Sequence, residues 1–330
     1  MMKNNNPLKN WRINIEDIRF IGKDLQRPVS HVSKSNGDLI VANTSSILTI
    51  SLDRGEQEYF FDHEKNKTKI KAAGGLSLTK KDDLVFADWE NNCIHLLTSK
   101  GVIIKTYTEI DGKPIGKVNS TTVDSYGRIW FTVTTRSEPW QNQINTRVSD
   151  GFIGVIDGNK ARIVADGFCW ANGIRFDAKE EWLYILETTG QRVSRLPVLA
   201  NGKLGEKELF GPSSLNGLAE GFAFDSYGNL WITMVFTDEI VAITPEGEKI
   251  LLISTTTQNQ KNQLLQAFEE HRMTPDIMGI HGSLVPYFSG ITFGGKDMKT
   301  VYLGSMGGTS IAYFNSPVSG LKLAKKKSIK

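Results

Sequence analysis

Two asparagines and one glutamate occupy matching places in three separate segments of this 330-residue chain. Asn119 and Glu220 each lie ten residues before the first apolar residue of a strand-like run, and Asn172 lies eleven residues before such a run. Amide and carboxylate oxygens are hard ligands that suit Ca²⁺ or Mg²⁺ better than Zn²⁺. If the segments converge, the three side chains could share one divalent cation, although an asparagine alone also commonly bonds its own backbone.

His31 and Phe222 extend this set by one layer, because each lies two residues beyond the corresponding place in its own segment. Side chains two residues apart on a strand share a face. A carboxylate and an imidazole in an apolar funnel can have pKa values in the range useful for proton transfer. We therefore predict Glu220 and His31 as catalytic acid and base, while a lone strand histidine is also commonly structural. His281, in the loop "GIHGSL", is predicted at the rim.

The elements that would position these residues repeat along the chain. The phrase "DSYGRIWFT" at 124–132 returns as "DSYGNLWIT" at 225–233, and four looser copies begin at Gly37, Asp82, Glu181 and Lys299. The first apolar residues of the six runs are separated by 45, 45, 54, 47 and 71 residues. A period near 45 that holds several short strands is typical of a propeller blade. The sequence therefore predicts an all-β fold, a six-bladed β-propeller with four-stranded blades.

The two long intervals predict insertions, which commonly form lids or binding loops on one rim. The first holds a polar loop with Trp140, and the second holds a helical insertion at about 257–275, before the last blade, which Pro275 is expected to end. The early strand "IEDIRFIG" is expected to pair with the last blade and close the ring. The predicted domains are an N-terminal extension at 1–16, one propeller at 17–323 and a basic C-terminal tail at 324–330.

Composition argues against several classes of partner. The net charge is only +3 and the basic residues are scattered, so no nucleic-acid partner is expected. Neither an apolar leader nor a long apolar run is present, which predicts a cytoplasmic protein with no membrane partner. Cys93 and Cys169 lie far apart without metal-binding spacing, so neither a disulfide framework nor a zinc knuckle is indicated. The expected partner is a small-molecule substrate.

Several segments, in their order and spacing, resemble the senescence marker protein 30/gluconolactonase/luciferin-regenerating-enzyme family. They are "ANGIRFDAKEEWLYILET", "AEGFAFDSYGNLWIT", "ITFGGKDMKTVYLGS" and "SPVSGL", and the resemblance spans roughly residues 25–323. It implies a six-bladed propeller and lactonase activity. It also implies one divalent cation at the channel mouth, held by a glutamate, two asparagines and an aspartate from separate blades.

The resemblance assigns roles to individual residues. The motif "KVNS" puts Asn119 on the first ligand asparagine and Lys117 on a substrate-binding arginine, and Asn172 matches the second asparagine. Glu220 stands where the family has the ligand aspartate, which is also the suspected general base. Val29 stands where many members have the ligand glutamate. One ligand carboxylate is therefore missing, which should weaken the binding of a cation; Ca²⁺ is favoured, with Mg²⁺, Mn²⁺ or Zn²⁺ as alternatives.

Three functions follow from these observations. In the first, a cation bound by Asn119, Asn172 and Glu220 polarises the carbonyl of a lactone or related cyclic ester and activates water. In the second, Glu220 and His31 act without a metal on a less polar substrate, in a hydrolase, isomerase or cyclase. In the third, the propeller binds a metabolite without catalysis. The expected substrate-binding residues are Lys117, Asn119, Asn172, Phe222 and His281.

Overall fold

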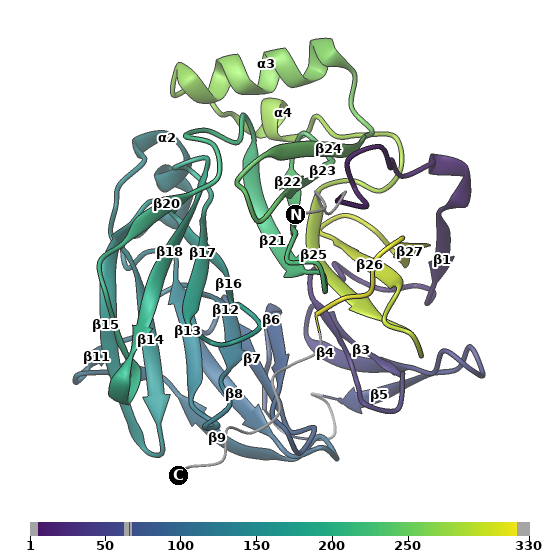
Figure 1. Ribbon diagram of the computed structural model, residues 1–330. Helices are drawn as coiled ribbons and strands as arrows, with labels where there is room; N and C mark the ends of the chain where they lie inside the picture. Colours follow the sequence, from purple (N-terminus) through teal and green to yellow (C-terminus); the bar gives the residue numbers. More distant parts are fainter. Residues whose placement is uncertain (1–5, 63–65, 67, 322–330) are drawn as a thin grey trace, which may run out of the picture.

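Six antiparallel sheets follow one another around a ring in the computed structural model, which describes residues 6–62, 66 and 68–321 (Figure 1). Five of these sheets have four strands, and the fourth blade has short additional outer strands. The predicted six-bladed β-propeller is therefore confirmed. Apolar clusters fill the spaces between neighbouring blades, so the core forms a ring rather than a single centre.

The first three blades run consecutively along the chain. Blade 1 contains β2 (His31–Ser33), β3 (Leu39–Asn43), β4 (Ser46–Ile50) and β5 (Gln57–Phe61). Blade 2 contains β6 (Ala73–Leu78), β7 (Leu84–Asp88), β8 (Cys93–Leu97) and β9 (Ile103–Tyr107). A small hairpin, β10 (Glu109–Ile110) with β11 (Lys113–Pro114), leads to blade 3, which contains β12 (Val118–Val123), β13 (Ile129–Val133), β14 (Gly151–Asp157) and β15 (Lys160–Phe168).

The other three blades complete the ring. Blade 4 contains β16 (Ala171–Phe176), β17 (Trp182–Glu187) and β18 (Arg192–Leu199), edged by β19 (Lys203–Leu204) and β20 (Glu208–Phe210). Blade 5 contains β21 (Leu218–Phe224), β22 (Leu230–Val235), β23 (Glu239–Ile243) and β24 (Lys249–Ser254). Blade 6 contains β25 (Phe288–Gly294), β26 (Thr300–Ser305) and β27 (Ile311–Asn315).

The doubled phrase forms the turn between the innermost and second strands of blades 3 and 5. Asp124 Oδ1 accepts the backbone N–H groups of the turn, while its Oδ2 accepts the indole N–H of Trp130 at 2.8 Å. Asp225 and Trp231 repeat this bond at 2.9 Å. Gly127 has a φ of 85°, a conformation that glycine adopts without steric cost. The phrase is repeated because the same turn and buried tryptophan are needed twice.

The N-terminal strand closes the ring as predicted. β1 (Arg19–Ile21) pairs antiparallel with β27 of blade 6, after a 3₁₀ turn, η1 (Ile15–Asp17). Residues 6–16 are more than an extension, because Leu8 is fully buried and the Trp11 ring packs 5.7 Å from that of Trp231. The predicted basic tail at 324–330 lies outside the described residues.

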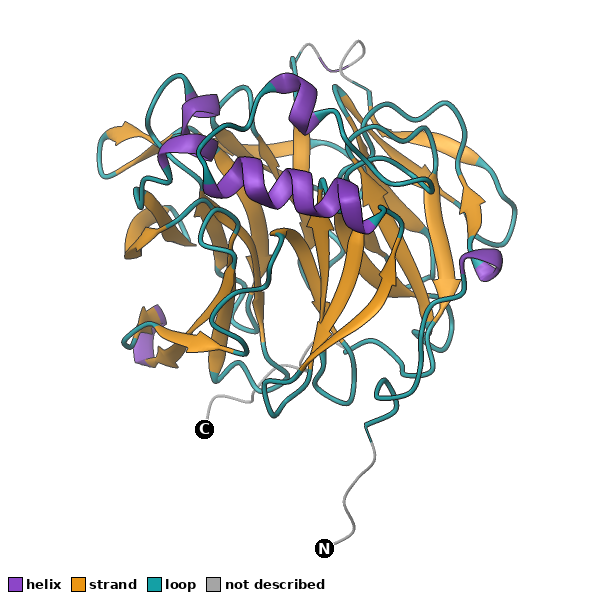
Figure 2. Cartoon of the chain, turned by 90° about the horizontal axis from the view of Figure 1, so that it is seen from above, coloured by secondary structure: helices purple, strands orange, loops and turns teal. Residues whose placement is uncertain are grey.

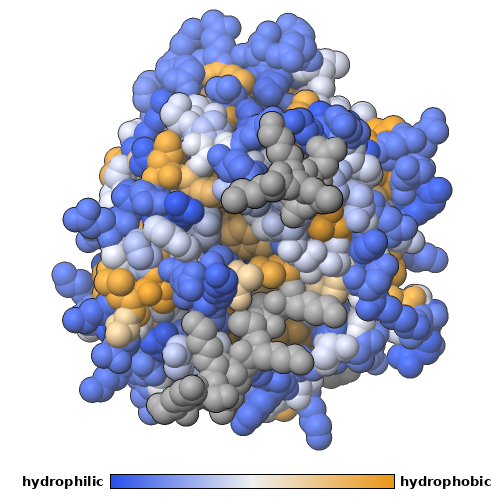
Figure 3. Space-filling view, viewed as in Figure 1, coloured by the Kyte–Doolittle hydropathy of each residue, from blue (hydrophilic) through white to orange (hydrophobic). Residues whose placement is uncertain are grey.

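Both predicted insertions lie on the rim where the second strands end. The first forms η2 (Trp140–Asn142) and α2 (Gln143–Thr146), and the second forms α3 (Gln258–Glu269) and α4 (Pro275–Met278). Figure 2 shows α3 lying across this rim. Its outward side chains are mostly hydrophilic, as is most of the face in Figure 3. Another 3₁₀ turn, η3 (Ala200–Gly202), lies in blade 4.

The helical insertion differs from the prediction at its end and is tied to its neighbour. Pro275 does not end the long helix; α3 ends at Glu269, and Pro275 begins α4, as its fixed φ favours. Asn145 of the first insertion donates to the Met273 carbonyl at 3.2 Å and accepts from the Met273 N–H at 3.0 Å. The two insertions are thus locked together. Within the described residues, no helix is long and apolar enough to cross a bilayer.

Candidate functional site

A cavity opens at the end of the channel where the innermost strands begin. The structure brings five predicted residues into its wall: Asn119, Asn172, Glu220, His31 and Phe222. The other lining residues are Arg27, Val29, Ser30, Ala72, Ala73, Gly74, Gly75, Ala87, Trp89, Val118, Ser120, Gly173, Arg175, Gly221, Gly290 and Ile291. Residues from all six blades therefore meet at one place.

Irregularities in strand pairing direct these residues into the cavity. The register between the innermost and second strands shifts between Val118 and Thr121, between Ala171 and Ile174, and between Ala219 and Phe222. The same shift occurs in blades 2 and 6. A β-bulge re-aims the side chains of the extra residues. Asn119, Asn172 and Glu220 lie within these bulges. The rest of each innermost strand pairs regularly, and the bulge is the place where the strand turns a polar side chain toward the cavity.

Threonines directly after the second strands orient the two asparagine amides. Thr188 donates its only hydroxyl proton to the Ala219 carbonyl at 2.6 Å, so it accepts from Asn172 Nδ2 at 3.0 Å. Thr134 likewise donates to Ala171 and accepts from Asn119 Nδ2 at 3.4 Å. The amide nitrogens are thereby fixed against the blades, and both asparagines hold one orientation without help from a ligand.

Glu220 is the carboxylate of the cavity. Its Oε2 accepts a hydrogen bond from Asn172 Nδ2 at 2.5 Å. Burial raises the pKa of Glu220 to about 7, and this effect exceeds the opposing influence of the Asn172 hydrogen bond and the positive charge of Arg27. A carboxyl group with this pKa exchanges protons near neutral pH, which is what a general base requires.

His31 lies deeper in the wall and is held by blade 6. Its Nε2 lies 2.9 Å from the Tyr302 carbonyl oxygen, which can only accept, so Nε2 carries the proton. Its buried Nδ1 has no hydrogen-bond partner in the described part of the chain. Burial and, to a smaller extent, the charge of Arg175 lower the pKa of His31 to about 4, against the Tyr302 hydrogen bond. The imidazole is therefore neutral at physiological pH.

Two predicted substrate-binding residues, Lys117 and His281, are not in the cavity wall. The Lys117 side chain is only 7% exposed, and its Nζ lies 3.5 Å from a Glu138 oxygen and 3.8 Å from a Glu90 oxygen. His281 is exposed, and its Nδ1 bonds the carbonyl of the adjacent Gly282 at 2.8 Å. Lys117 thus neutralises carboxylates beside the cavity, while His281 belongs to the helical insertion.

Sequence reasoning missed Arg27 and Trp89. Arg27 lines the cavity, and its backbone φ is 55°, a conformation that cannot be predicted from its residue type. Trp89 also lines it, and its ring centroid lies 5.3 Å from that of Trp140 and 6.5 Å from that of Trp170. The one available signal for Arg27 was its position in the sequence. It lies two residues before Val29, which occupies the place of a ligand glutamate in many family members.

The wall supplies an incomplete set of donors for a divalent cation. Calcium takes six to eight oxygen ligands, commonly with several carboxylates. Among the lining residues, Glu220 is the only carboxylate, Val29 and Gly74 supply no side-chain donor, and Arg27 brings a positive charge. The predicted cation thus finds three of its expected donors, Asn119, Asn172 and Glu220, but not the fourth. These residues do not fit a Ca²⁺ or Mg²⁺ site well.

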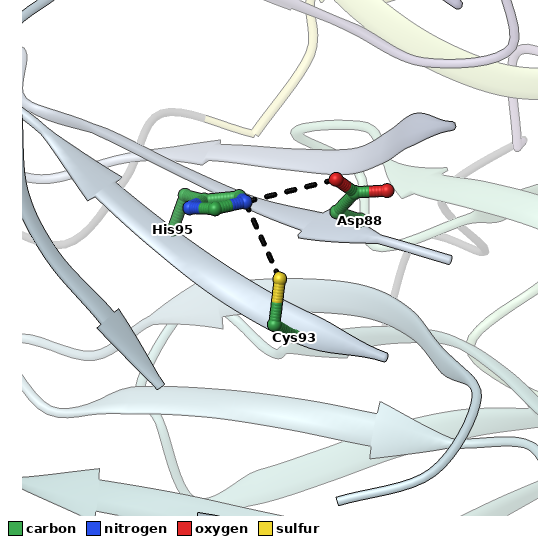
Figure 4. Close-up of side chains that lie close together, drawn as sticks. All are labelled: Asp88, Cys93 and His95. Atoms are coloured by element: carbon green, nitrogen blue, oxygen red, sulfur yellow. Dashed lines mark hydrogen bonds and ion pairs between the residues drawn. The ribbon is translucent and has the colours of Figure 1, made fainter. Parts of the chain in front are cut away.

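A second set of ligand-type atoms lies within blade 2, beside the cavity (Figure 4). Asp88, Cys93 and His95 are buried and place one carboxylate oxygen, one sulfur and one imidazole nitrogen within 4.8 Å of one another. Such a set could hold a metal ion. His95 Nε2 lies 3.3 Å from Cys93 Sγ and 3.7 Å from Asp88 Oδ2. His95 is thus a buried partner of Cys93, although the spacing of the cysteines in the sequence did not indicate a metal site.

Blade 4 shows what this cluster does. Asp88 pairs with Cys93 across its hairpin as Glu187 pairs with Arg192, and His95 corresponds to Ser194. Glu187 bonds Arg192 and Ser194 and accepts the N–H of Cys169. Asp88 likewise accepts the N–H groups of Lys71 and Ala72, and burial with the nearby Asp88 charge raises the pKa of the Cys93 thiol to about 12. Both clusters hold the loop that enters an innermost strand, so the cluster in blade 2 has a structural role.

Together, the closed ring of blades and the polar cavity at the start of its innermost strands define a six-bladed propeller with a small-molecule site. The chain belongs to the SMP-30/gluconolactonase/LRE-like family, whose model matches residues 69–265. A 6-deoxy-6-sulfogluconolactonase of Pseudomonas putida is 24% identical over 216 residues, which cover 64% of this chain and 62% of that enzyme.

Solved structures support the same fold. A gluconolactonase from Xanthomonas campestris is 16% identical with a TM-score of 0.69, covering 95% of this chain and 94% of the other. Regucalcin from Agrobacterium tumefaciens, described as a calcium-binding protein, is 14% identical with a TM-score of 0.66, covering 93% and 98%. At these identities the likeness establishes the fold, and the chemistry must be argued from the cavity.

Proposed function

We propose that the protein hydrolyses a lactone or related cyclic carboxylic ester of a small molecule. The observation that carries the proposal is the convergence of Asn119, Asn172 and Glu220 in one cavity, on bulges that aim them at the same space. Relatives named as lactonases, including the sulfogluconolactonase, favour the same reaction class. The tryptophan cluster at Trp89 adds an apolar wall, which favours substrates with an apolar face.

Glu220 acts as the general base in this proposal. It takes a proton from a water molecule as the water oxygen bonds to the acyl carbon, and the negative charge moves to the carbonyl oxygen. When the carbonyl re-forms, the ring C–O bond breaks, and the departing oxygen takes the proton back from Glu220 as a hydroxyl group. One lactone and one water thus give one hydroxycarboxylic acid. Asn172 holds the Glu220 carboxylate in place through the 2.5 Å hydrogen bond.

The test is hydrolysis of a panel of sugar lactones and alkyl-substituted lactones by the purified protein, followed by acid release. Glu220→Gln keeps an acceptor for Asn172 but cannot take a proton, so turnover should fall by about 10²–10⁴-fold. Glu246→Gln, at an exposed position in blade 5, is the matched control and should retain wild-type turnover. Failure of the wild type on every lactone, or full turnover by Glu220→Gln, would refute the proposal.

A further inference from the structure

Arg27 is a positively charged residue in the cavity wall. A site built from oxygen donors for a metal ion has no use for such a charge. Its guanidinium carries five N–H donors, and within the described part of the chain it makes no hydrogen bond within 3.5 Å and no ion pair within 4.0 Å. Most buried arginines are paired. A partly buried guanidinium whose donors are left unused is therefore available to a ligand in the cavity.

The backbone around Arg27 holds it in position from both sides. The neighbouring Gln26 donates its N–H to Asn43 Oδ1 at 2.6 Å and accepts from Thr44 Oγ1 at 2.8 Å, which ties the loop to blade 1. The Pro28 carbonyl accepts from Ser305 N–H at 3.1 Å, which ties it to blade 6. These bonds hold Arg27 at a φ of 55°, a strained conformation for a residue with a side chain. Such strain persists only where the surroundings impose it, and it commonly accompanies function.

Arg27 and Glu220 line the same cavity, and Glu90 lies close enough to add to the negative charge that Arg27 experiences. The two side chains interact electrostatically, since each shifts the pKa of the other toward the charged form, yet they do not approach within 4.0 Å. A gap between a guanidinium and a carboxylate can admit a small polar group. A carbonyl in this gap would present its oxygen to Arg27 and its carbon to a water molecule beside Glu220. Arg175, deeper in the channel, adds a second positive charge.

We infer that the Arg27 guanidinium is the resident cation of this cavity, that it binds the substrate carbonyl oxygen, and that the site works without a divalent metal ion. This inference rests on the proposed hydrolysis, and it names Arg27 as the group that stabilises the negative charge on the carbonyl oxygen. As water adds to the acyl carbon, the electron pair that moves to the carbonyl oxygen is stabilised by the Arg27 N–H groups, and no further reactant is needed. Two positive side chains and one carboxylate also make the wall unfavourable for a divalent ion.

The first experiment measures metal content and thermal stability of the wild type, with and without EDTA and after addition of Ca²⁺, Mg²⁺, Mn²⁺ or Zn²⁺. We expect no bound metal and no shift in Tm, because an ion that bound only the folded state would raise it. Near-stoichiometric metal, or a Tm shift that disappears in Glu220→Gln, would overturn the inference. This readout needs no substrate, so it decides the inference even if the lactone panel fails and the proposed function is refuted.

The second experiment follows hydrolysis in EDTA. Arg27→Met, which keeps side-chain length without charge, should lose about 10²–10³-fold in kcat/KM, the usual cost of removing an oxyanion donor. Arg27→Ala should regain activity when guanidinium is added at a concentration that does not unfold the protein. Arg54→Met is the matched control, because the Arg54 side chain is 64% exposed and pairs with Glu56, away from the cavity. Unchanged kcat/KM in a folded Arg27→Met protein, or activity that depends on added metal, would overturn the inference.

Discussion

Replacing Glu220 by glutamine should stabilise the protein while abolishing its proposed activity. Burial raises the pKa of Glu220 from its ordinary 4.5 to about 7, so the folded state holds this proton more tightly than the unfolded chain. The free energy of unfolding of the wild type therefore falls as the pH rises from about 4.5 to about 7. The difference in pKa corresponds to about 3 kcal/mol at neutral or higher pH. Glutamine has no proton to lose and escapes this cost.

The assay is thermal unfolding of both proteins in EDTA across the pH range from about 5 to 8. An unfolding entropy of about 2.1 cal/mol/K per residue makes 3 kcal/mol equal to a rise in Tm of about 4 °C for Glu220→Gln at the upper end. At the lower end the difference in Tm should shrink to about 1 °C. Glu246→Gln, exposed in blade 5, should follow the wild type throughout. A Tm difference that does not change with pH would show that the folded state does not perturb the Glu220 carboxyl.

Two further predictions concern the supports of the site. His31→Leu leaves the buried Tyr302 carbonyl without its imidazole donor, so the free energy of unfolding should fall by about 1–3 kcal/mol. The kcat per folded molecule should be retained. A large loss of kcat with unchanged stability would instead show that His31 is catalytic. Asn145→Ala removes both hydrogen bonds to Met273, so amide hydrogen exchange in α3 and α4 should accelerate while that of the blades does not. Equal protection of the helices in both proteins would show that the insertions are held by other contacts.

The fold could be predicted because its evidence is local and repeated. Among the first apolar residues of the six repeated runs, Leu39, Leu84, Ile129 and Leu230 begin second strands, and the other two are the second residues of β17 and β26. Counting back from these residues to the innermost strand crosses a hairpin of nearly constant length. That constancy is why Asn119, Asn172 and Glu220 meet in the structure although they lie far apart in the sequence.

The parts of the site that could not be predicted depend on backbone geometry and distant contacts. Counting ten residues back from Val301 fails in blade 6, because its hairpin is longer: Ile291, not Phe293, takes the place of Phe222. Phe293 instead aligns with Phe224, and both line a different cavity at the opposite end of the channel. Lys117 is adjacent to a site strand in sequence, yet Glu90 and Glu138 hold it outside the wall. The contribution of Arg27 depends on a positive φ that is imposed by blades 1 and 6.

The same architecture explains how the loops that line the cavity can carry different side chains without loss of the fold. A polar side chain at or just beyond the end of a second strand holds backbone N–H groups of a loop that leads to an innermost strand: Asn43 holds Gln26, Asp88 holds Ala72, Glu187 holds Cys169 and Asp238 holds Phe288. These bonds are made to backbone, so they do not depend on the side chains that the loops present to the cavity. Val29 and Arg27 lie on such a loop. Substitutions there alter the charge of the cavity, while the bonds that position the strand, and most of the stability of the blade, remain.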